Sequence, residues 1–410
     1  MSTFAPGTQG DGVAMDRRQG TGEWLAAVHA GATTLSPNRA TVVGFDLEGR
    51  PHHWLVAGET FKRSLSSEVF GRRTEAGVRK RWRVESRDAA ALFLWARDVA
   101  RAAQAALERG EVRLSGKGAS ADTTRQRLAD IVRWNPERLE AERERYLRAY
   151  RPVSILPPDQ YQSVVLQATY GCSWNRCAYC TFYQDRAFSV RTPEAFEPHL
   201  AAVRELLGAS AEARRSVFFG DGNALVLANR RLLPLMEMAR DAFPGRPLAG
   251  FVDVFSGEKK RLEEWRALRA LGLRSVAIGV ETGHDPLLSY LNKPGSADEA
   301  ADFVATLKEA GLAVSVILMV GAGGTRFAEG HLRDSAALLG RLPLTEGDVV
   351  YLSPFVVQSG SPYAERAARD GTVPLSEGER DEQYRALKAA ARLAAPASRV
   401  ALYHIDEFVY

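Results

Sequence analysis

Three residues of this 410-residue chain have the side-chain chemistry and spacing of a metal centre. They are its only cysteines, Cys172, Cys177 and Cys180. A C-x4-C-x2-C segment brings three thiols to one inorganic centre, because two to four intervening residues span the distance between neighbouring ligands. A structural zinc site or a fully protein-ligated iron–sulfur cluster takes four protein ligands. Three thiolates would therefore leave one metal position open, and an open position is where chemistry takes place.

Two alternatives to an open metal centre remain for the cysteines. Three inert buried thiols would need no metal, and a zinc site would need a fourth ligand from elsewhere in the fold. None of the seven histidines lies within the motif, and the nearest in sequence is His199. A disulfide scaffold is excluded by the odd number of cysteines and by a length that supports a large core without staples.

Composition and length predict a globular protein of one large or two ordinary domains. Apolar residues make up 45% of the chain and charged residues 25%. The net charge of +4, from 54 basic and 50 acidic residues, does not by itself imply a polyanionic partner. The longest apolar stretch, residues 312–320, is too short to span a bilayer, and no signal peptide is visible. With free thiols, these features predict a cytoplasmic protein that does not bind membranes.

The elements that must position the cysteines lie in a segment where strands and helices alternate. Apolar, β-branched runs occur at six places, which are residues 164–169, 216–220, 248–254, 274–280, 312–320 and 348–354. Helical patterns separate these runs, so we expect a parallel α/β sheet with right-handed crossovers. Ligands in such folds gather where strands end, and Cys172 comes just after the first run.

Composition shifts divide the rest of the chain. We expect a disordered tail at residues 1–22, an N-terminal α+β domain at 23–155, the strand–helix segment at 156–360, and a C-terminal helical extension with a docked tail at 361–410. Within the N-terminal domain, the patterns predict two strands at 41–45 and 53–56, a helix ending near Gly110, and a second helical stretch over about 121–149. The aromatic tail, with Tyr403, Phe408 and Tyr410, could cover the mouth of the fold.

Three further motifs follow strands. Gly220-Asp221-Gly222 would let backbone approach a ligand and offers a carboxylate to an ammonium group, although an ordinary turn has the same sequence. Glu281 ends an apolar strand, where a carboxylate is costly unless it has a partner. It would either accept hydrogen bonds from ribose hydroxyls or serve as a helix N-cap or in a salt bridge. Gly321 begins a glycine-rich run that lacks the lysine of a phosphate loop.

The segment from Gln167 to Cys180 resembles the cluster motif of the radical S-adenosylmethionine (SAM) superfamily, with Tyr179 as the aromatic residue before the last cysteine. The usual spacing is C-x3-C-x2-C. The extra residue here is typical of an Fe–S oxidoreductase subgroup reminiscent of anaerobic coproporphyrinogen oxidase.

This resemblance implies a partial (β/α)6 TIM-like barrel. It implies a [4Fe–4S] cluster on the three cysteines, with SAM on the open iron. By the same resemblance Gly220, Asp221 and Gly222 contact the methionyl amino group, Glu281 contacts the ribose, and Gly321 contacts the adenine. The implied reaction generates a 5′-deoxyadenosyl radical with electrons from a flavodoxin- or ferredoxin-type donor. The substrate, expected to be a small molecule, and the catalytic residues are not identified.

A basic stretch keeps a nucleic-acid function open as the alternative. Residues 62–87 hold nine Lys or Arg against three Glu, beside Phe61, Phe70 and Trp82. A solvated face accounts for such charge most simply, but interleaved aromatics also suit nucleic acid. The alternatives are therefore a tRNA- or RNA-modifying radical SAM enzyme, or a non-catalytic, metal-stabilised nucleic-acid-binding module.

Overall fold

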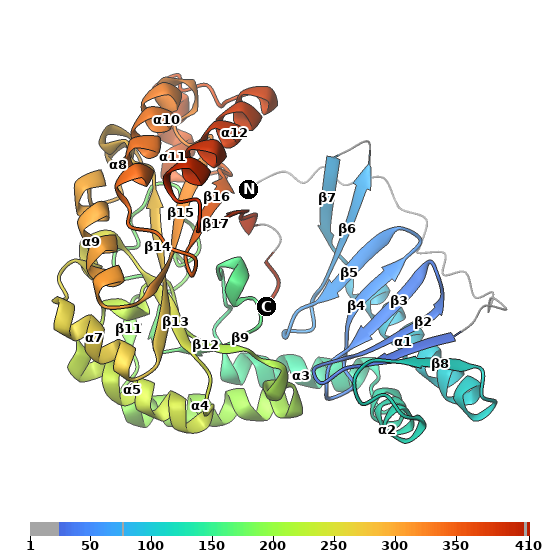
Figure 1. Ribbon diagram of the computed structural model, residues 1–410. Helices are drawn as coiled ribbons and strands as arrows, with labels where there is room; N and C mark the ends of the chain where they lie inside the picture. Colours follow the sequence, from blue (N-terminus) through green and yellow to red (C-terminus); the bar gives the residue numbers. More distant parts are fainter. Residues whose placement is uncertain (1–23, 76–77, 406–407) are drawn as a thin grey trace. The chain divides into compact units, whose positions relative to one another are not determined.

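The computed structural model describes residues 24–75, 78–405 and 408–410, and the predicted disordered tail at 1–22 lies outside them. The chain divides into two compact units that are interleaved in sequence. Of the described residues, the N-terminal unit comprises 24–75, 78–152, 201–214 and 409–410. The parallel-sheet unit comprises 153–200, 215–405 and 408. Each unit has its own sheet and core (Figure 1).

The N-terminal unit has one sheet, which has eight strands among the described residues, in the order β7-β6-β5-β4-β3-β2-β1-β8. The strands are β1 (Trp24–Val28), β2 (Thr33–Asn38), β3 (Thr41–Phe45), β4 (Pro51–Val56), β5 (Glu59–Arg63), β6 (Val69–Glu75), β7 (Val78–Arg83) and β8 (Val112–Ser115). Neighbours pair antiparallel except β1 and β8, which are parallel. The helices are α1 (Ser86–Glu108), α2 (Ala121–Val132) and α3 (Pro136–Ala149).

The core of this unit follows from alternation along the strands. Trp54 and Phe61 are opposite each other on β4 and β5, and both are fully buried. The apolar stripe of α1 covers this face of the sheet, and the Phe93 ring lies 5.9 Å from that of Trp54. A sheet with one face covered by helices has the alternating pattern that antiparallel strands allow.

Two sequence expectations for this unit were incomplete. The helical stretch over 121–149 is two helices, because Asn135 accepts a hydrogen bond from the Arg138 amide as an N-cap and Pro136 starts α3. The two predicted strands are β3 and β4, and the other strands were not predicted.

The basic stretch lies largely on the β6–β7 hairpin, where Arg73 pairs with Glu75 at 2.6 Å and the Arg81 guanidinium lies 4.6 Å from the Phe70 ring centre. Nucleic-acid binding by this stretch stays a prediction.

The parallel-sheet unit contains the predicted alternation of strands and helices. Its main sheet, within the described chain, has seven parallel strands in the order β17-β16-β15-β14-β13-β12-β9. They are β9 (Ser163–Gln167), β12 (Ser216–Gly220), β13 (Leu248–Val252), β14 (Leu273–Glu281), β15 (Ala313–Val320), β16 (Val349–Pro354) and β17 (Arg399–Leu402). A short hairpin of β10 (Thr169–Tyr170) and β11 (Ser189–Val190) flanks the cysteines.

Helices follow most strands and lie along the outer side of the sheet (Figure 1). They are α4 (Pro193–Leu207), α5 (Asn229–Ala242), α6 (Val254–Gly257), α7 (Leu262–Ala270), α8 (Asp285–Tyr290), α9 (Ala297–Glu309), α10 (Gly324–Arg341), α11 (Pro362–Arg369) and α12 (Glu377–Ala394). Short 3₁₀ turns occur at η1 (Pro158–Gln160), η2 (Gly208–Ala213) and η3 (Ala224–Val226). Residues 201–214, which include the end of α4 and all of η2, count with the N-terminal unit.

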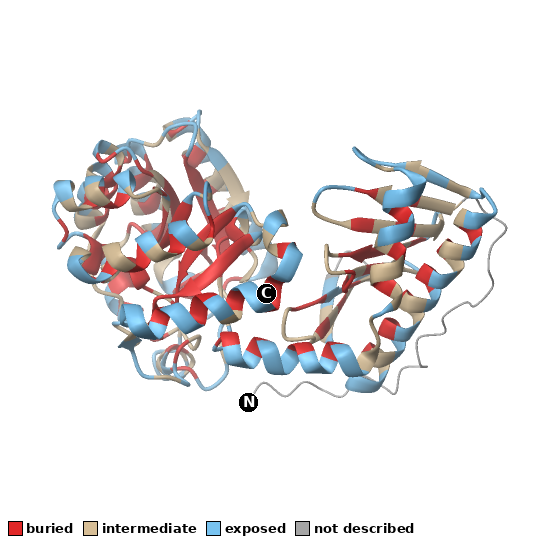
Figure 2. Ribbon diagram, turned by 90° about the horizontal axis from the view of Figure 1, so that it is seen from below, coloured by how far each residue is buried: buried red, intermediate tan, exposed pale blue. Residues whose placement is uncertain are grey.

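The predicted α/β class and the six predicted strands are confirmed. The strands are buried almost throughout, as Figure 2 shows, which is why their sequences are continuous apolar runs. In the described residues β9 and β17 form the two edges of the sheet, so the barrel is partial and open. The edge strand β17 was not predicted, because its four residues are half exposed and begin with Arg399.

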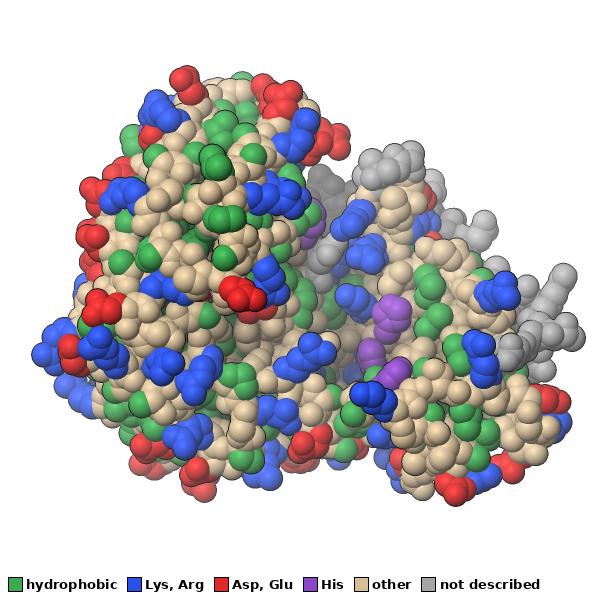
Figure 3. All heavy atoms as spheres, viewed as in Figure 1, with side chains coloured by type: hydrophobic (Ala, Val, Ile, Leu, Met, Phe, Trp, Pro, Cys, Tyr) green, Lys and Arg blue, Asp and Glu red, His purple; other side chains and the backbone are tan. Residues whose placement is uncertain are grey.

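The surface has mixed charge. Acidic and basic side chains are interspersed over the face shown in Figure 3, in keeping with the small net charge of +4. No helix in the described part of the chain is both long and apolar enough to cross a membrane.

Candidate cofactor-binding site

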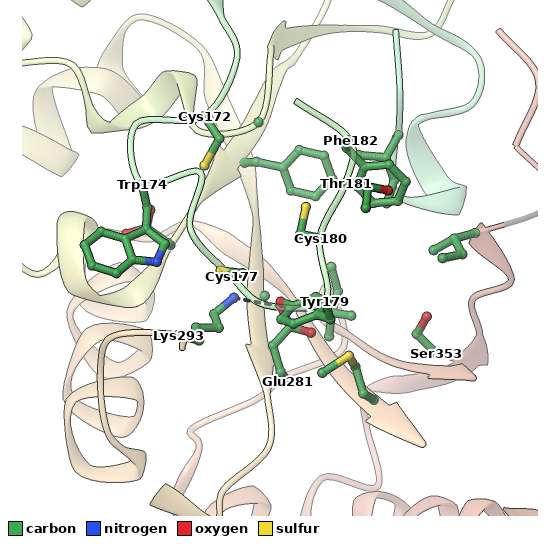
Figure 4. A pocket seen from close by; sticks show the side chains of 18 of the residues that line it. Cys172, Trp174, Cys177, Tyr179, Cys180, Thr181, Phe182, Glu281, Lys293 and Ser353 are labelled. Carbon is green, nitrogen blue, oxygen red and sulfur yellow. Dashed lines mark hydrogen bonds and ion pairs between the residues drawn. The ribbon is translucent and has the colours of Figure 1, made fainter. Parts of the chain in front are cut away.

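A cavity of about 200 Å³ lies in the parallel-sheet unit, and residues of four adjacent strands line it. They are Phe251 and Val252 on β13, Gly279 and Glu281 on β14, Ile317 and Met319 on β15, and Ser353 and Pro354 on β16. On β14 and β15 they are alternate residues. Because side chains alternate between the two faces of a strand, one face of the sheet supplies this wall and the other carries the helices. Figure 4 shows the loop that follows β10 lying across this cavity.

The three cysteines all line this cavity, and all are half-buried. They lie on one loop, as Figure 4 shows. Burial raises the pKa of the Cys177 thiol to about 12 and that of the Cys180 thiol to about 11. Metal binding would therefore displace protons from these thiols.

The donor set fits a [4Fe–4S] cluster. Thiolates are the ligands that iron–sulfur clusters prefer. Among the described residues, no group of three or more His, Cys, Asp or Glu is arranged to hold a single metal ion. In a [4Fe–4S] cluster each thiolate binds a different iron atom, so three sulfurs around one cavity are sufficient without meeting at one point.

The turn after α8 holds the cysteine loop through three hydrogen bonds. The Ala178 amide donates to the Leu291 carbonyl at 2.8 Å, and the Trp174 indole donates to the Asn292 carbonyl at 3.0 Å. The Asn292 side chain donates in return to the Arg176 carbonyl at 2.7 Å. These three loop residues lie between the cysteines, so the turn fixes the backbone that carries the thiols.

Glu281 lies on the cavity wall in a buried network. Its Oε1 accepts hydrogen bonds from the Tyr179 hydroxyl at 3.0 Å and from the Lys293 ammonium at 2.7 Å. The Glu281 backbone has φ +68° at a shift in the β14–β15 register, so the strand turns where this carboxylate is presented. Of the expected cofactor residues, Tyr179 and Glu281 are thus brought together beside the cysteines.

Asp221 lies behind the cysteine loop. Its carboxylate accepts hydrogen bonds from the Gln167 side chain at 2.7 Å and from the Gly171 amide at 2.9 Å, and it lies 3.3 Å from the Arg186 guanidinium. Burial raises the pKa of Asp221, although these donors oppose that effect. Asp221 therefore ties the start of the loop to β9 and β12.

The three expected glycines have different surroundings. Gly222 lines the cavity, and a Cβ there would lie 2.4 Å from the Tyr183 ring, so only glycine fits. Gly220 is buried at the end of β12 and is not part of the cavity wall. Gly321 follows β15, where its amide donates to the Gln383 side chain at 2.7 Å, and it too lies outside the wall.

Sequence reasoning missed Lys293 and His331. Lys293 lies twelve residues after Glu281, in the turn sequence Asn292-Lys293-Pro294-Gly295, and a cation in a turn gives no sign of its partner. His331, fully buried on α10, contacts the Met319 carbonyl through Nε2 at 2.7 Å. Its Nδ1 lies 2.6 Å from the hydroxyl of Thr282, the residue after Glu281.

The C-terminal segment contributes to the same cavity. Tyr403 is buried, lines the wall, and donates to the Leu156 carbonyl at 2.7 Å. Ile405 also lines the wall, and the Phe408 ring lies 5.4 Å from that of Tyr161. The predicted docking concerns residues 402–410, of which 406 and 407 lie outside the described residues. Coverage of the mouth by the whole tail stays a prediction.

Comparisons with known proteins match the segment that carries the cysteines and Glu281. Residues 166–332 match the profile of the Radical SAM superfamily. A stretch of 133 residues is 30% identical to the heme chaperone HemW of Mycobacterium tuberculosis, covering 31% of this chain and 34% of that protein. The chain thus spans about a third of the length of the curated relatives it matches.

Solved structures give weaker likenesses. Coproporphyrinogen III oxidase (HemN) of Escherichia coli, a radical SAM enzyme, is 14% identical, with 61% of this chain and 60% of that chain covered and a TM-score of 0.42. The radical SAM methyltransferase TsrM of Kitasatospora setae is 18% identical, with coverage of 54% and 44% and a TM-score of 0.41.

The profile match covers less than half of the chain. Over residues 166–332 the chain is therefore similar to the radical SAM superfamily, whose members are enzymes that use a [4Fe–4S] cluster and SAM.

Proposed function

We propose that this chain is a radical SAM enzyme, which binds a [4Fe–4S] cluster on Cys172, Cys177 and Cys180 and cleaves SAM reductively. When bound, these cofactors supply a 5′-deoxyadenosyl radical that abstracts hydrogen from a substrate. One observation carries the proposal: three thiols on one loop share a cavity with a buried carboxylate at the end of a parallel strand. A flavodoxin- or ferredoxin-type protein would be the one-electron donor.

The other residues of the wall have supporting roles in this proposal. Glu281 would accept hydrogen bonds from the SAM ribose, and Tyr179 and Lys293 hold its carboxylate in place. Gly222 would allow the methionyl part of SAM to approach the backbone. Asp221, whose oxygens both have donors, would support the cluster by fixing the Gly171 amide rather than by meeting the ammonium group itself.

We propose that the substrate is a small molecule. The part of it from which the radical abstracts hydrogen is uncharged. Away from the cysteines the wall is mainly apolar and aromatic, and its members there include Ile155, Phe251, Ile317, Val356, Tyr403 and Ile405. Apolar walls exclude water, which would otherwise enter a site where a reactive intermediate forms. An apolar wall also binds a charged group poorly, since such a group would lose hydration without gaining a partner.

The test is the replacement of each cysteine by alanine. Cys177→Ala should remove most of the iron and acid-labile sulfide from anaerobically reconstituted protein, and should abolish the formation of 5′-deoxyadenosine from SAM. Ser173→Ala, in the same loop, is the matched control and should retain both. Full iron loading in Cys177→Ala would show that the ligand assignment is wrong, and colourless, zinc-containing wild-type protein would favour the non-catalytic alternative.

A further inference from the structure

Lys293 is a charged residue of the cavity to which the proposed function assigns only the holding of the Glu281 carboxylate. Of the described residues that line the cavity, Lys293 alone is a cation, and Asp253 and Glu281 are the anions. The side chains of Lys293 and Glu281 are each only 10% exposed. A buried ammonium group is costly unless it is paired, so its place beside the cysteines indicates a specific role.

The backbone fixes where this ammonium group lies. The Lys293 amide donates to the Leu288 carbonyl at 3.0 Å, which ends α8. The two preceding residues, Leu291 and Asn292, form the three hydrogen bonds to the cysteine loop. The turn that holds the cysteines therefore also carries Lys293, and Figure 4 shows its ammonium group next to Cys177.

The surroundings keep Lys293 charged. A carboxylate within hydrogen-bonding distance favours the charged form of a buried amine. Glu281 offsets the positive charge of Lys293 at 2.7 Å, while Asp253 adds a further carboxylate to the same wall. Without Lys293, the described residues that line the cavity would include two carboxylates and no cation beside the three cysteines.

Reduction of a cluster bound at this site adds one negative charge beside the carboxylates of Glu281 and Asp253. The electron comes from the external one-electron donor, and the charge it brings is stabilised by a nearby cation and destabilised by nearby carboxylates. Net charge and surrounding polar groups are among the factors that set cluster potentials. We propose that Lys293 raises the reduction potential of the cluster by compensating the negative charges of Glu281 and Asp253. This role depends on the proposed function, because it needs the cluster.

The experiment is a potentiometric titration of the reconstituted protein without SAM, with the reduced cluster followed by electron paramagnetic resonance. Lys293→Met should shift the midpoint potential to a more negative value, and Lys293→Arg, the charge-conserving control, should stay near wild type. Glu281→Gln should shift the potential in the positive direction. The double variant Glu281→Gln/Lys293→Met should lie closer to wild type than Lys293→Met alone. Shifts in these directions would show that the charge of each side chain, and not a loss of packing, changes the potential.

Two results would overturn the proposal. One is a wild-type potential in a fully loaded Lys293→Met protein. The other is an equal negative shift in Lys293→Met and Lys293→Arg, which would indicate a purely structural role. If Lys293→Met does not load iron, Glu281→Gln decides the question, since an unchanged potential there contradicts charge control. Wild-type protein that never binds iron would instead refute the proposed function.

Discussion

At the scale of single residues, Glu281 is the side chain whose role can be separated most clearly from that of the cluster. Its carboxylate lies on the cavity wall and is held by two donors rather than by a metal-ligating group. Glu281→Ala should weaken SAM binding by about 1–3 kcal/mol, the cost of leaving hydrogen-bonding groups without a partner. Equilibrium dialysis of the reconstituted protein with labelled SAM would measure this change.

Iron content provides the control for that experiment, because Glu281 is not a proposed ligand and the variant should load normally. Glu281→Gln keeps the shape and one acceptor oxygen, so it should retain more SAM affinity than the alanine variant. Unchanged SAM affinity in Glu281→Ala would reduce Glu281 to a salt-bridge partner of Lys293.

His331 makes the stability of the parallel-sheet unit depend on pH. Burial lowers its pKa from 6.5 to about 4, although its contact with the Met319 carbonyl opposes that effect. In the unfolded chain a histidine binds a proton near pH 6.5, while folded His331 stays neutral down to about pH 4. Its contribution to stability is therefore complete above pH 6.5 and is lost as the pH falls towards 4.

Between pH 7.5 and 5 this linkage should lower the free energy of unfolding by about 2 kcal/mol, at 1.36 kcal/mol for each pKa unit. Urea unfolding at the two pH values would measure it. His331→Gln should be less stable at both values but should lose much of the difference between them. An equal pH difference in wild type and variant would show that other groups cause it.

At the scale of elements, the strands that could be predicted from the sequence are those that are buried on both faces. Strands β12 and β15 are buried almost throughout, so they are continuous apolar runs and were predicted. Strand β7 has the sequence VRKRWR, with three consecutive basic residues, and such a charged run does not have the apolar alternation that predicts a strand. The contact between Lys293 and Glu281 could not be predicted, because it depends on the register shift that turns β14 at Glu281.

Tyr403, just after β17, tests whether the C-terminal segment closes the cavity. The residue is 1% exposed, its hydroxyl is bonded to the Leu156 carbonyl, and its ring lies 5.6 Å from that of Tyr351. Tyr403→Ala should destabilise the parallel-sheet unit by about 3–5 kcal/mol through the cavity it leaves. It should also increase the cleavage of SAM that occurs without substrate, because water gains access to the site.

Tyr403→Phe is the matched control, since it removes only the hydroxyl and should cost about 1 kcal/mol. Thermal unfolding and the yield of 5′-deoxyadenosine without substrate would measure the two effects. Stability and uncoupled cleavage at wild-type levels in Tyr403→Ala would show that the segment does not close the cavity.

At the scale of the whole molecule, the two units are not consecutive pieces of chain. Residues 201–214 and 409–410 belong to the N-terminal unit, although the chain between them forms most of the parallel-sheet unit. The sequence predicted consecutive domains with a boundary near residue 155, whereas the N-terminal unit also includes these two later segments. No local sequence pattern marks the change of unit at residue 201, because it lies inside one continuous helix, α4 (residues 193–207). The apolar periodicity of this helix is the same on both sides of residue 201.

Arg50 shows how the N-terminal unit holds one of these returning segments. Its guanidinium pairs with Asp46 and Glu142, each at 2.7 Å, and donates to the carbonyls of Leu206 at 2.7 Å and Leu207 at 3.1 Å. The carbonyls at the end of α4 have no partner within the helix, and a guanidinium can serve them and both carboxylates at once. Arg50 thus joins three parts of the chain that are distant in sequence.

Replacing Arg50 should therefore destabilise the N-terminal unit strongly, because several groups lose their hydrogen-bond partner at once. Arg50→Met would leave the half-buried Asp46 carboxylate without its cation and the buried Glu142 carboxylate with Arg145 alone, a loss of about 3–5 kcal/mol. Arg50→Lys restores the charge but not the fork of donors, so its loss should be intermediate. Denaturant unfolding, with circular dichroism to follow the N-terminal sheet, would measure both variants. If Arg50→Met unfolds within roughly 1 kcal/mol of wild type, below the cost expected for breaking a buried pair, the guanidinium does not hold this segment in place.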